Sequence, residues 1–190
     1  MKSDIILCGV GGQGILSIAT VLGQAATEAG LCLKQAEVHG MSQRGGDVQS
    51  HLRLSTDPIW SDLIPLRGAD LIISMEPMEA LRYLPWLSEN GRIISASTPF
   101  VNIPDYPDQE RLLAELDSRK GTVRLDIEAA ARQAGNPKGA NMVLLGAAAA
   151  YLPILGADQL RHAIQVIFAA KGSEVVEANL RAFDLGAGKQ

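Results

Sequence analysis

The chain has 190 residues, of which 47% are hydrophobic; this is enough for one sizeable core and too little for two, so a single domain spanning residues 1–190 is expected. A formal net charge of -4, from 17 basic and 21 acidic side chains spread along the chain, excludes an obvious nucleic-acid or membrane-binding surface. The two cysteines, Cys8 and Cys32, lie in apolar segments without metal-ligand spacing, which predicts reduced core thiols rather than a disulfide or a metal site.

The first elements in chain order are a strand, a glycine-rich turn and a helix. Residues 4–10 (DIILCGV) form a continuous apolar run, typical of a strand buried in a parallel sheet. Residues 15–30 carry apolar side chains at helical spacing and end at Gly30, a residue suited to a left-handed cap. A second strand at 31–38 completes the pattern of a βαβ unit. The N-terminus shows no secretory signal pattern, so a cytoplasmic location is expected.

The next segments predict further strands with helices between them. Residues 48–55 alternate between apolar and polar side chains, which indicates a strand with one wet face, antiparallel at an edge of the sheet. Residues 61–75 predict a short helix and then a buried strand at Asp70–Met75. A helix is predicted at 77–91, ending at its last glycine, and a strand at 92–98.

The rest of the chain is dominated by helical patterns. Three prolines in residues 99–107 predict a surface connection. The later elements are a helix at 109–121, a strand at 122–126, a helix at 127–135 and a mostly helical region at 140–183. The apolar stretch 140–155 is shorter than the ~20 residues of a membrane span and predicts a buried helix. Alternating strands and helices therefore predict an α/β fold with a largely parallel sheet and a helical C-terminal region.

The glycine turn carries the first candidate site. Gly9, Gly11 and Gly14 match G-x-G-x-x-G, directly after a strand and at the start of a helix. Glycines permit close backbone approach, and the free amides and dipole of a helix start favour an anion. Glu37, 23 residues beyond Gly14, is the candidate ribose-binding carboxylate of a dinucleotide site. The alternative is that the glycines only let the strand and helix pack closely.

A second glycine-bearing loop, residues 39–47 (HGMSQRGGD), follows the second strand. In a parallel sheet it leaves the same edge as the first loop, so the two loops are expected to border one crevice. His39, Ser42, Gln43 and Arg44 supply hydrogen-bond donors for a phosphate or carboxylate, and no nucleophile–base–orienter triad is evident. Arg44 is otherwise a solvated surface cation.

Several other residues have both a structural and a functional interpretation. Asn141 either caps the apolar helix or faces the shared crevice. The small side chains of 146–150 allow close approach of a helix, either within the chain or at a subunit interface. The methionines and the isolated histidines are interpreted as core-filling and as structural or solvent-facing residues, respectively: Met75, Met78, Met142, His51 and His162.

Three stretches together resemble a known family. GVGGQGI, EVHGMSQRGGDVQSHLR and NPKGANMVLLGA are similar, in this order, to the gamma-type component of the pyruvate/2-oxoacid:ferredoxin oxidoreductase family, in particular the indolepyruvate type (beta subunit). The resemblance covers nearly the whole chain. It implies a Rossmann-like domain docked beside the active site of a larger partner that carries thiamine diphosphate, magnesium and iron–sulfur clusters.

The resemblance also implies a division of labour. The complex would oxidatively decarboxylate an aryl or other 2-oxoacid, pass electrons to ferredoxin and transfer the acyl group to coenzyme A. This chain would hold no tightly bound cofactor, since it has no cysteine set for a cluster and no acidic-Asn motif for a magnesium-bound thiamine diphosphate. An isolated subunit would expose apolar surface, and a homodimer of the isolated chain would be unsurprising.

No catalytic residue is assigned to this chain. The residues expected to border the partner's active site are Gly9, Gly11, Gly12, Gln13, Gly14, Ser42, Gln43, Arg44, Gly45 and Asn141. Two alternatives stay open from the sequence: a self-contained NAD(P)- or flavin-binding oxidoreductase that uses Glu37, and a non-enzymatic nucleotide-binding module. The 2-oxoacid itself is not specified, because the pocket for its side chain would lie largely on the partner.

Overall fold

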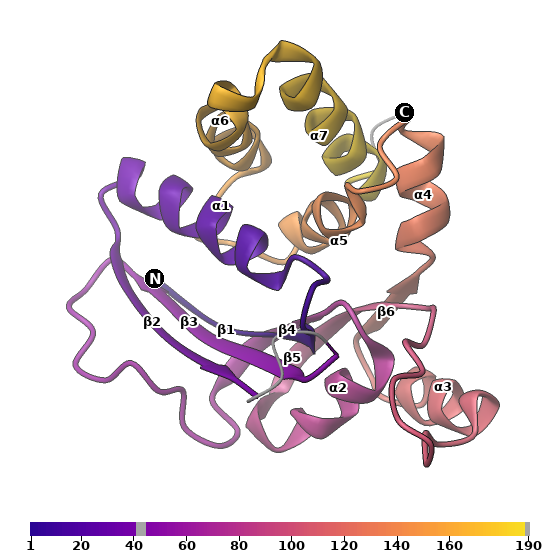
Figure 1. Ribbon diagram of the computed structural model, residues 1–190. Helices are drawn as coiled ribbons and strands as arrows, with labels where there is room; N and C mark the ends of the chain where they lie inside the picture. The colour runs from indigo at the N-terminus through magenta and orange to yellow at the C-terminus, as the bar shows by residue number, and fades with distance from the viewer. Residues whose placement is uncertain (41–44, 189–190) are drawn as a thin grey trace.

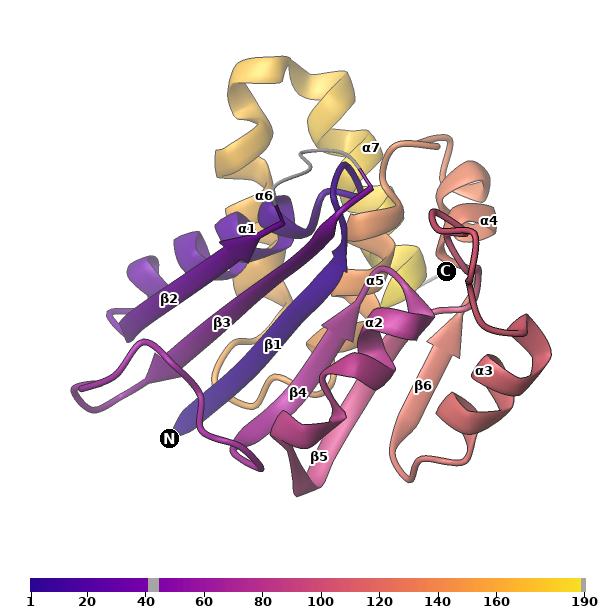
Figure 2. The same ribbon diagram turned by 60° about the horizontal axis from the view of Figure 1, so that its bottom comes forward.

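A six-stranded mixed sheet with helices on both faces forms the frame of the protein (Figures 1 and 2). The computed structural model describes residues 1–40 and 45–188. Its strands are β1 (Lys2–Val10), β2 (Cys32–His39), β3 (Asp47–Ser55), β4 (Ala69–Ser74), β5 (Leu87–Ala96) and β6 (Thr122–Leu125). Its helices are α1 (Ile15–Glu28), α2 (Pro77–Arg82), α3 (Gln109–Asp117), α4 (Ile127–Gln133), α5 (Ala140–Ala149), α6 (Ala157–Phe168) and α7 (Ser173–Gly186), with 3-10 turns at Leu84–Trp86 and Ala169–Lys171.

The strand order is β2-β3-β1-β4-β5-β6, and β3 alone runs against the other five strands of the described chain. The predicted α/β class and largely parallel sheet are confirmed. The predicted position of residues 48–55 is wrong in one respect. The strand is antiparallel, as expected, but it lies between β2 and β1, and β2 occupies the edge. The first βαβ unit therefore has another strand inserted between its two strands.

The apolar side chains of β1 alternate between two cores. Ile5 and Leu7 pack under α1 and α5, whereas Ile6 and Cys8 pack on the opposite face with Ile72 of β4. Helices α1, α4, α5, α6 and α7 cover the first face, and α2 and α3 cover the second (Figure 1). Because both faces are covered, a central strand without polar alternation is what the fold requires.

The small residues of 146–150 lie where α5 packs closely against α7 of the same chain. A Cβ on Gly146 would lie 2.0 Å from the carbonyl oxygen of Phe183, and one on Gly186 would lie 1.9 Å from that of Val143. The glycines therefore serve packing between two helices of the same chain. Met142 is fully buried in this core, as predicted. In the part of the chain that the structure describes, no helix is long and apolar enough to cross a membrane.

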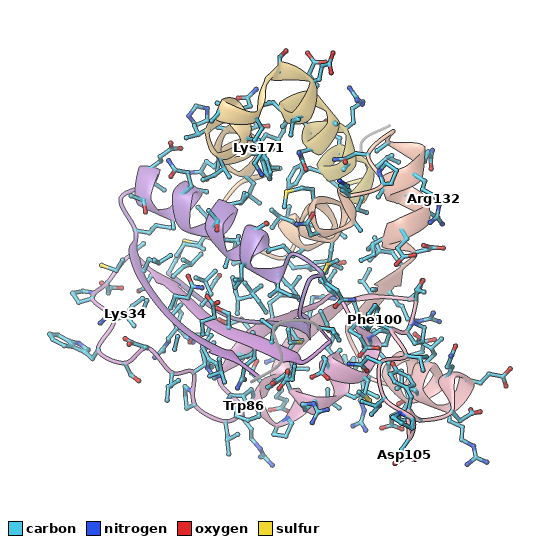
Figure 3. All side chains as sticks on the ribbon, in the orientation of Figure 1. Lys34, Trp86, Phe100, Asp105, Arg132 and Lys171 are labelled. Atoms are coloured by element: carbon cyan, nitrogen blue, oxygen red, sulfur yellow. The ribbon has the colours of Figure 1, made fainter. Side chains whose placement is uncertain are left out.

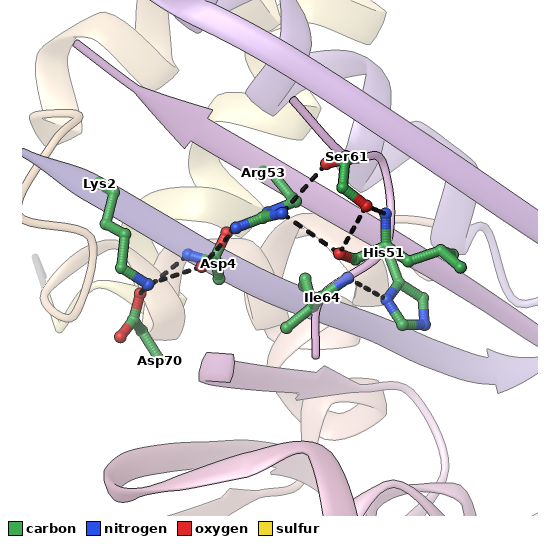
Figure 4. Close-up of polar contacts among 8 residues, drawn as sticks. Lys2, Asp4, His51, Arg53, Ser61, Ile64 and Asp70 are labelled. Atoms are coloured by element: carbon green, nitrogen blue, oxygen red, sulfur yellow. Dashed lines mark hydrogen bonds and ion pairs between the residues drawn. The ribbon is translucent and has the colours of Figure 1, made fainter. Parts of the chain in front are cut away.

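The short helix predicted within residues 61–68 is absent, because side chains of β3 form hydrogen bonds with the backbone there (Figure 4). The Arg53 guanidinium donates to the carbonyl oxygens of Ser61 at 3.0 Å and Leu63 at 3.2 Å. Nδ1 of His51 accepts from the Ile64 amide at 3.0 Å, so His51 is structural, as interpreted. This connection also covers β3, which explains why His51 is buried on the face predicted to be wet.

The helix predicted at 77–91 is also too long. Helix α2 ends at Arg82, and β5 begins at Leu87, where it pairs with Ala69. Pro85 lacks the amide that would bond to the carbonyl of residue 81, so the helical ladder cannot continue through it. The connection at 99–107 contains no helix or strand, as its prolines predict.

Candidate functional site

The first glycine loop joins β1 to α1 at the carboxyl edge of the sheet. Gly14 is the N-cap of α1 with φ of 83°, and a Cβ there would lie 2.7 Å from Nδ2 of Asn141. Gly12 has φ of 100° with open space around it. Both conformations favour glycine, since side chains of L-residues rarely adopt them. The loop therefore presents bare backbone at the start of a helix, as G-x-G-x-x-G predicts.

The Gln13 side chain holds this loop from inside. Its Oε1 accepts from the Val10 amide at 2.7 Å, and its Nε2 donates to the Met75 carbonyl oxygen at 3.2 Å. Gln13 thus ties the loop to the ends of β1 and β4, the two neighbouring parallel strands. The amide group is occupied within the protein, so Gln13 contributes by shaping the loop.

Asn141 fixes the other end of the loop. It is the second residue of α5, whose N-cap is Gly139, so it does not occupy the capping position. Its Nδ2 donates to the Gly14 carbonyl oxygen at 3.2 Å, and its Oδ1 accepts from the Met142 amide at 3.0 Å. Of the two interpretations from sequence, the structure supports the one in which Asn141 faces the glycine loop.

The two glycine loops meet, as expected from the sequence. The Gly11 amide donates to the Gly46 carbonyl oxygen at 2.8 Å, and the Gly45 amide donates to the Gly11 carbonyl oxygen at 3.4 Å. We call residues 11–14 and 45–46 the glycine rim. Ser42, Gln43 and Arg44 lie outside the described residues, as does the side chain of His39.

A third segment, which the sequence did not associate with the site, reaches the rim. Residues 99–106, here called the strap, follow β5. Nδ2 of Asn102 donates to the Gly45 carbonyl oxygen at 2.6 Å. The Phe100 amide donates to Oε1 of Glu76 at 3.3 Å, and the Tyr106 hydroxyl donates to the same oxygen. The strap is thereby connected both to the rim and to the start of α2.

Two cavities flank the rim. One, of about 710 Å³, lies between the rim, the start of α5 and α7; the other, of about 440 Å³, lies between the rim, the strap and α4. Gly12, Gln13 and Lys138 border both cavities. Figure 3 shows Lys171 of the larger cavity and Arg132 of the smaller one among the helices that cover the first face of the sheet. Acidic side chains also line the cavities, Glu174 and Glu177 in the larger one and Glu128 in the smaller one, so the part that suits an anionic ligand is the bare backbone of the rim with Lys138 beside it.

A buried acidic cluster lies beneath the rim on the opposite face of the sheet. Burial and the nearby charge of Asp47 raise the pKa of Glu79 to about 7, and the Arg82 guanidinium, 2.9 Å away, opposes the rise. The Tyr83 hydroxyl donates to both carboxylate oxygens of Asp47, at 3.1 and 3.0 Å. Burial, followed by the charge of Asp47, raises the pKa of that tyrosine. The base of the second glycine loop is therefore anchored, through the Asp47 carboxylate, to the residue that caps the C-terminus of α2.

A known protein family matches the sequence over almost its whole length. The pyruvate ferredoxin/flavodoxin oxidoreductase model matches residues 4–188. The chain belongs to this family.

Relatives that match over nearly their full length show which subunits of the family the chain resembles. The protein is 36% identical over 192 residues to the indolepyruvate oxidoreductase subunit IorB of Thermococcus kodakarensis, covering 96% of this chain and 93% of the relative. It is likewise 36% identical over 197 residues to the IorB subunit of Methanothermobacter thermautotrophicus, covering 99% of this chain and 97% of the relative. The family resemblance found in the sequence motifs is confirmed.

Solved structures of the pyruvate ferredoxin/flavodoxin oxidoreductase family share the fold. Pyruvate oxidoreductase subunit PORC from Thermotoga maritima matches with a TM-score of 0.74 and 22% identity, over 98% of this chain and 96% of that one. The 2-oxoglutarate:ferredoxin oxidoreductase from Magnetococcus marinus, with 2-oxoglutarate, coenzyme A and succinyl-CoA bound, matches with a TM-score of 0.76 and 21% identity. This chain covers only 31% of that longer chain, while 99% of this chain is matched.

Membership of the family, together with the strand order, shows that the alternative interpretation of the chain as a self-contained dinucleotide-binding enzyme is wrong. Glu37 lies on β2 opposite Ser50, and Ser50 lies opposite Leu7 of β1, so β3 separates the carboxylate from the glycine strand by two strand spacings, roughly 10 Å. In addition, Oε2 of Glu37 accepts from Nε2 of Gln35 at 3.2 Å. Within residues 1–40 and 45–188, no group of three or more His, Cys, Asp or Glu side chains could hold a metal ion.

Proposed function

We propose that the chain is the small, gamma-type subunit of an indolepyruvate ferredoxin oxidoreductase that works with a larger catalytic partner. The observation that carries this proposal is the full-length similarity, at 34–36% identity, to four IorB subunits, combined with a glycine rim that offers backbone rather than a catalytic triad. We place the complex in the cytoplasm, with ferredoxin as its electron acceptor.

The overall reaction oxidises an arylpyruvate. Arylpyruvate and coenzyme A yield the arylacetyl-CoA and CO₂, and the two electrons released reduce ferredoxin. Thiamine diphosphate with magnesium and iron–sulfur clusters would be held by the partner, where they would supply the decarboxylation chemistry and the route for the electrons. The residues of this chain bind and orient coenzyme A, and they exclude water from the partner's active site.

The rim is the part of this chain suited to that role. Within the described residues, the amides of Gly12 and Gly14 donate to no protein acceptor; Gly14 is the N-cap of the 14-residue helix α1, and Gly12 lies two residues before it. Together with Lys138, they provide a positive surface for the phosphates of coenzyme A, while the 2-oxoacid is bound on the partner. Docked over the partner's active site, this surface would exclude water while the acyl group is transferred.

Co-expression with the larger subunit tests the proposal. The two chains are expected to co-purify, and the complex is expected to reduce ferredoxin with indolepyruvate and coenzyme A, whereas neither chain does so alone. Phenylpyruvate, pyruvate and 2-oxoglutarate should give lower kcat/KM. Titration of the isolated chain with NAD, NADP and flavins should show no tight binding. A chain that remains alone and is active by itself would refute the assignment.

A further inference from the structure

Glu76 is a fully buried carboxylate that serves two segments at once. It is the N-cap of α2, and its Oε2 accepts from the Glu79 amide at 2.9 Å. Its Oε1 accepts from the Phe100 amide at 3.3 Å and from the Tyr106 hydroxyl. Two of its three donors therefore belong to the strap, one near each end.

Capping alone does not require such an arrangement. Asp108 caps the longer helix α3 from an exposed position, with its Oδ1 accepting from the Arg111 amide at 3.0 Å. Burying a charge is costly unless hydrogen bonds compensate for the lost water. The two strap donors supply that compensation at Glu76, and in return the carboxylate fixes where the strap runs.

The strap carries one inward-facing polar side chain between these anchors. Asn102 donates to the Gly45 carbonyl oxygen at 2.6 Å, whereas its neighbours Val101 and Ile103 are exposed. Its Oδ1 is buried without a hydrogen-bond partner among the described residues. Asn102 is therefore held in place by the path of the strap, which Glu76 sets.

The other half of the rim is anchored next to Glu76. Gln13 donates to the carbonyl oxygen of Met75, the residue that precedes Glu76, and the Met75 amide donates to the Cys8 carbonyl oxygen at 3.0 Å. The turn after β4 thus contacts both glycine loops, one through Gln13 and the other through the strap.

We propose that Glu76 is a positioning residue that, through the strap and Asn102, fixes the glycine rim in the shape against which the partner's active site closes. This inference rests on the proposed function, since the rim acts on a reaction only in the complex. It assigns no contact between Glu76 and substrate.

Amide exchange of the isolated chain tests the coupling. The probe is the Gly11 amide, which donates to Gly46, and the reference is the Ile73 amide in the central strand β4. The test variants are Glu76→Gln, Tyr106→Phe and Asn102→Ala. The matched control is Asp108→Ala, which removes the side-chain acceptor of a cap near the strap. Gln offers one acceptor oxygen and cannot serve both the Glu79 and Phe100 amides.

We expect Gly11 to exchange about five- to tenfold faster in the test variants, with Ile73 unchanged, because one hydrogen bond of the supporting chain is lost. Tyr106→Phe and Asn102→Ala keep the buried carboxylate, so they answer the question even if Glu76→Gln does not fold. An unchanged Gly11 rate, or the same rate change in Asp108→Ala, overturns the proposal.

Steady-state kinetics of the reconstituted complex test the consequence for the reaction. The test variants should lower kcat/KM for coenzyme A by about five- to tenfold and leave KM for the 2-oxoacid, bound on the partner, unchanged. Faster exchange at Gly11 with wild-type kinetics would overturn the positioning role. If even the wild-type chains form no active complex, the proposed function fails, and the exchange data still show whether Glu76 holds the rim.

Discussion

Gly11 and Gly46 are joined by a hydrogen bond of 2.8 Å, although they are 35 positions apart in the chain, with α1 and β2 between them. The bond exists because β3 begins where β1 ends: Val10 pairs with Asp47 in the register of the two strands. The insertion of β3 beside β1 therefore places Glu37, the candidate ribose-binding carboxylate, too far from the first glycine loop. At the same time it brings the second glycine loop against the first. The same change of topology explains both findings.

Replacing Gly14 with Ala should destabilise the protein by about 1–3 kcal/mol, because φ of 83° is combined with a contact of 2.7 Å to Nδ2 of Asn141. Urea denaturation measures the free energy of unfolding. Gly30→Ala is the matched control: its φ is 68°, but nothing lies within 4 Å of the added Cβ. The control should lose about 1 kcal/mol. Equal losses in the two variants would show that the Asn141 contact is unimportant.

Replacing Gly146 with Ala should be much more damaging, with a loss above roughly 3 kcal/mol or failure to fold, since the added Cβ would overlap the Phe183 carbonyl oxygen at 2.0 Å. Gly23→Ala in α1 is the control, because its nearest neighbour would be at 3.8 Å. That variant should gain about 0.5–1 kcal/mol from helix propensity. Thermal melting and soluble yield distinguish the two; a stable Gly146→Ala variant would contradict the close packing of α5 on α7.

Glu79 should make the stability depend on pH. Its pKa is about 7 in the folded protein, against an ordinary value of 4.5, so between these values the folded state keeps a proton that the unfolded state releases. The free energy of unfolding should therefore fall as pH rises from about 4.5 to about 7. Glu79→Gln should remove on the order of 2 kcal/mol of this fall.

Urea denaturation at pH 5 and pH 8 measures the effect. Glu115→Gln, which alters a half-exposed carboxylate of α3 paired with Arg119, is the control and should keep the wild-type dependence. Parallel stability curves for wild type and Glu79→Gln would show that Glu79 and its neighbour Asp47 do not retain the proton.

The sequence predicted what depends on local pattern. The strand–glycine–helix start and the meeting of the two glycine loops follow from apolar periodicity and from the rule that loops gather at the carboxyl edge of parallel strands. The sequence did not predict the insertion of β3, because strand order depends on long-range pairing. It placed residues 48–55 at an edge because Gln49 and Arg53 are polar, whereas the observed position is covered by the connection that follows.

The supporting residues of the site were missed for a similar reason. Glu76 and Asn102 carry no motif, and their roles depend on the strap passing over the start of α2, which is a tertiary contact. Prolines in 99–107 correctly predicted a connection without regular structure but said nothing about its contacts. Asn141 was identified because it lies in a recognisable stretch, and the structure shows which atom of the loop it holds.

Replacing Lys138 with Ala should impair the complex without affecting the fold. Lys138 borders both cavities beside Gly12, and it is the only cation that the two share among the described residues. If the rim faces an anionic co-substrate, losing this charge should raise KM for coenzyme A by about three- to tenfold, with kcat changed less. The effect should shrink at high ionic strength, since salt screens the attraction in the wild-type complex.

Lys120→Ala, in the turn before β6, removes the same charge far from the rim and should be neutral. Equal KM values for the two variants at low salt would show that Lys138 does not contribute to binding coenzyme A.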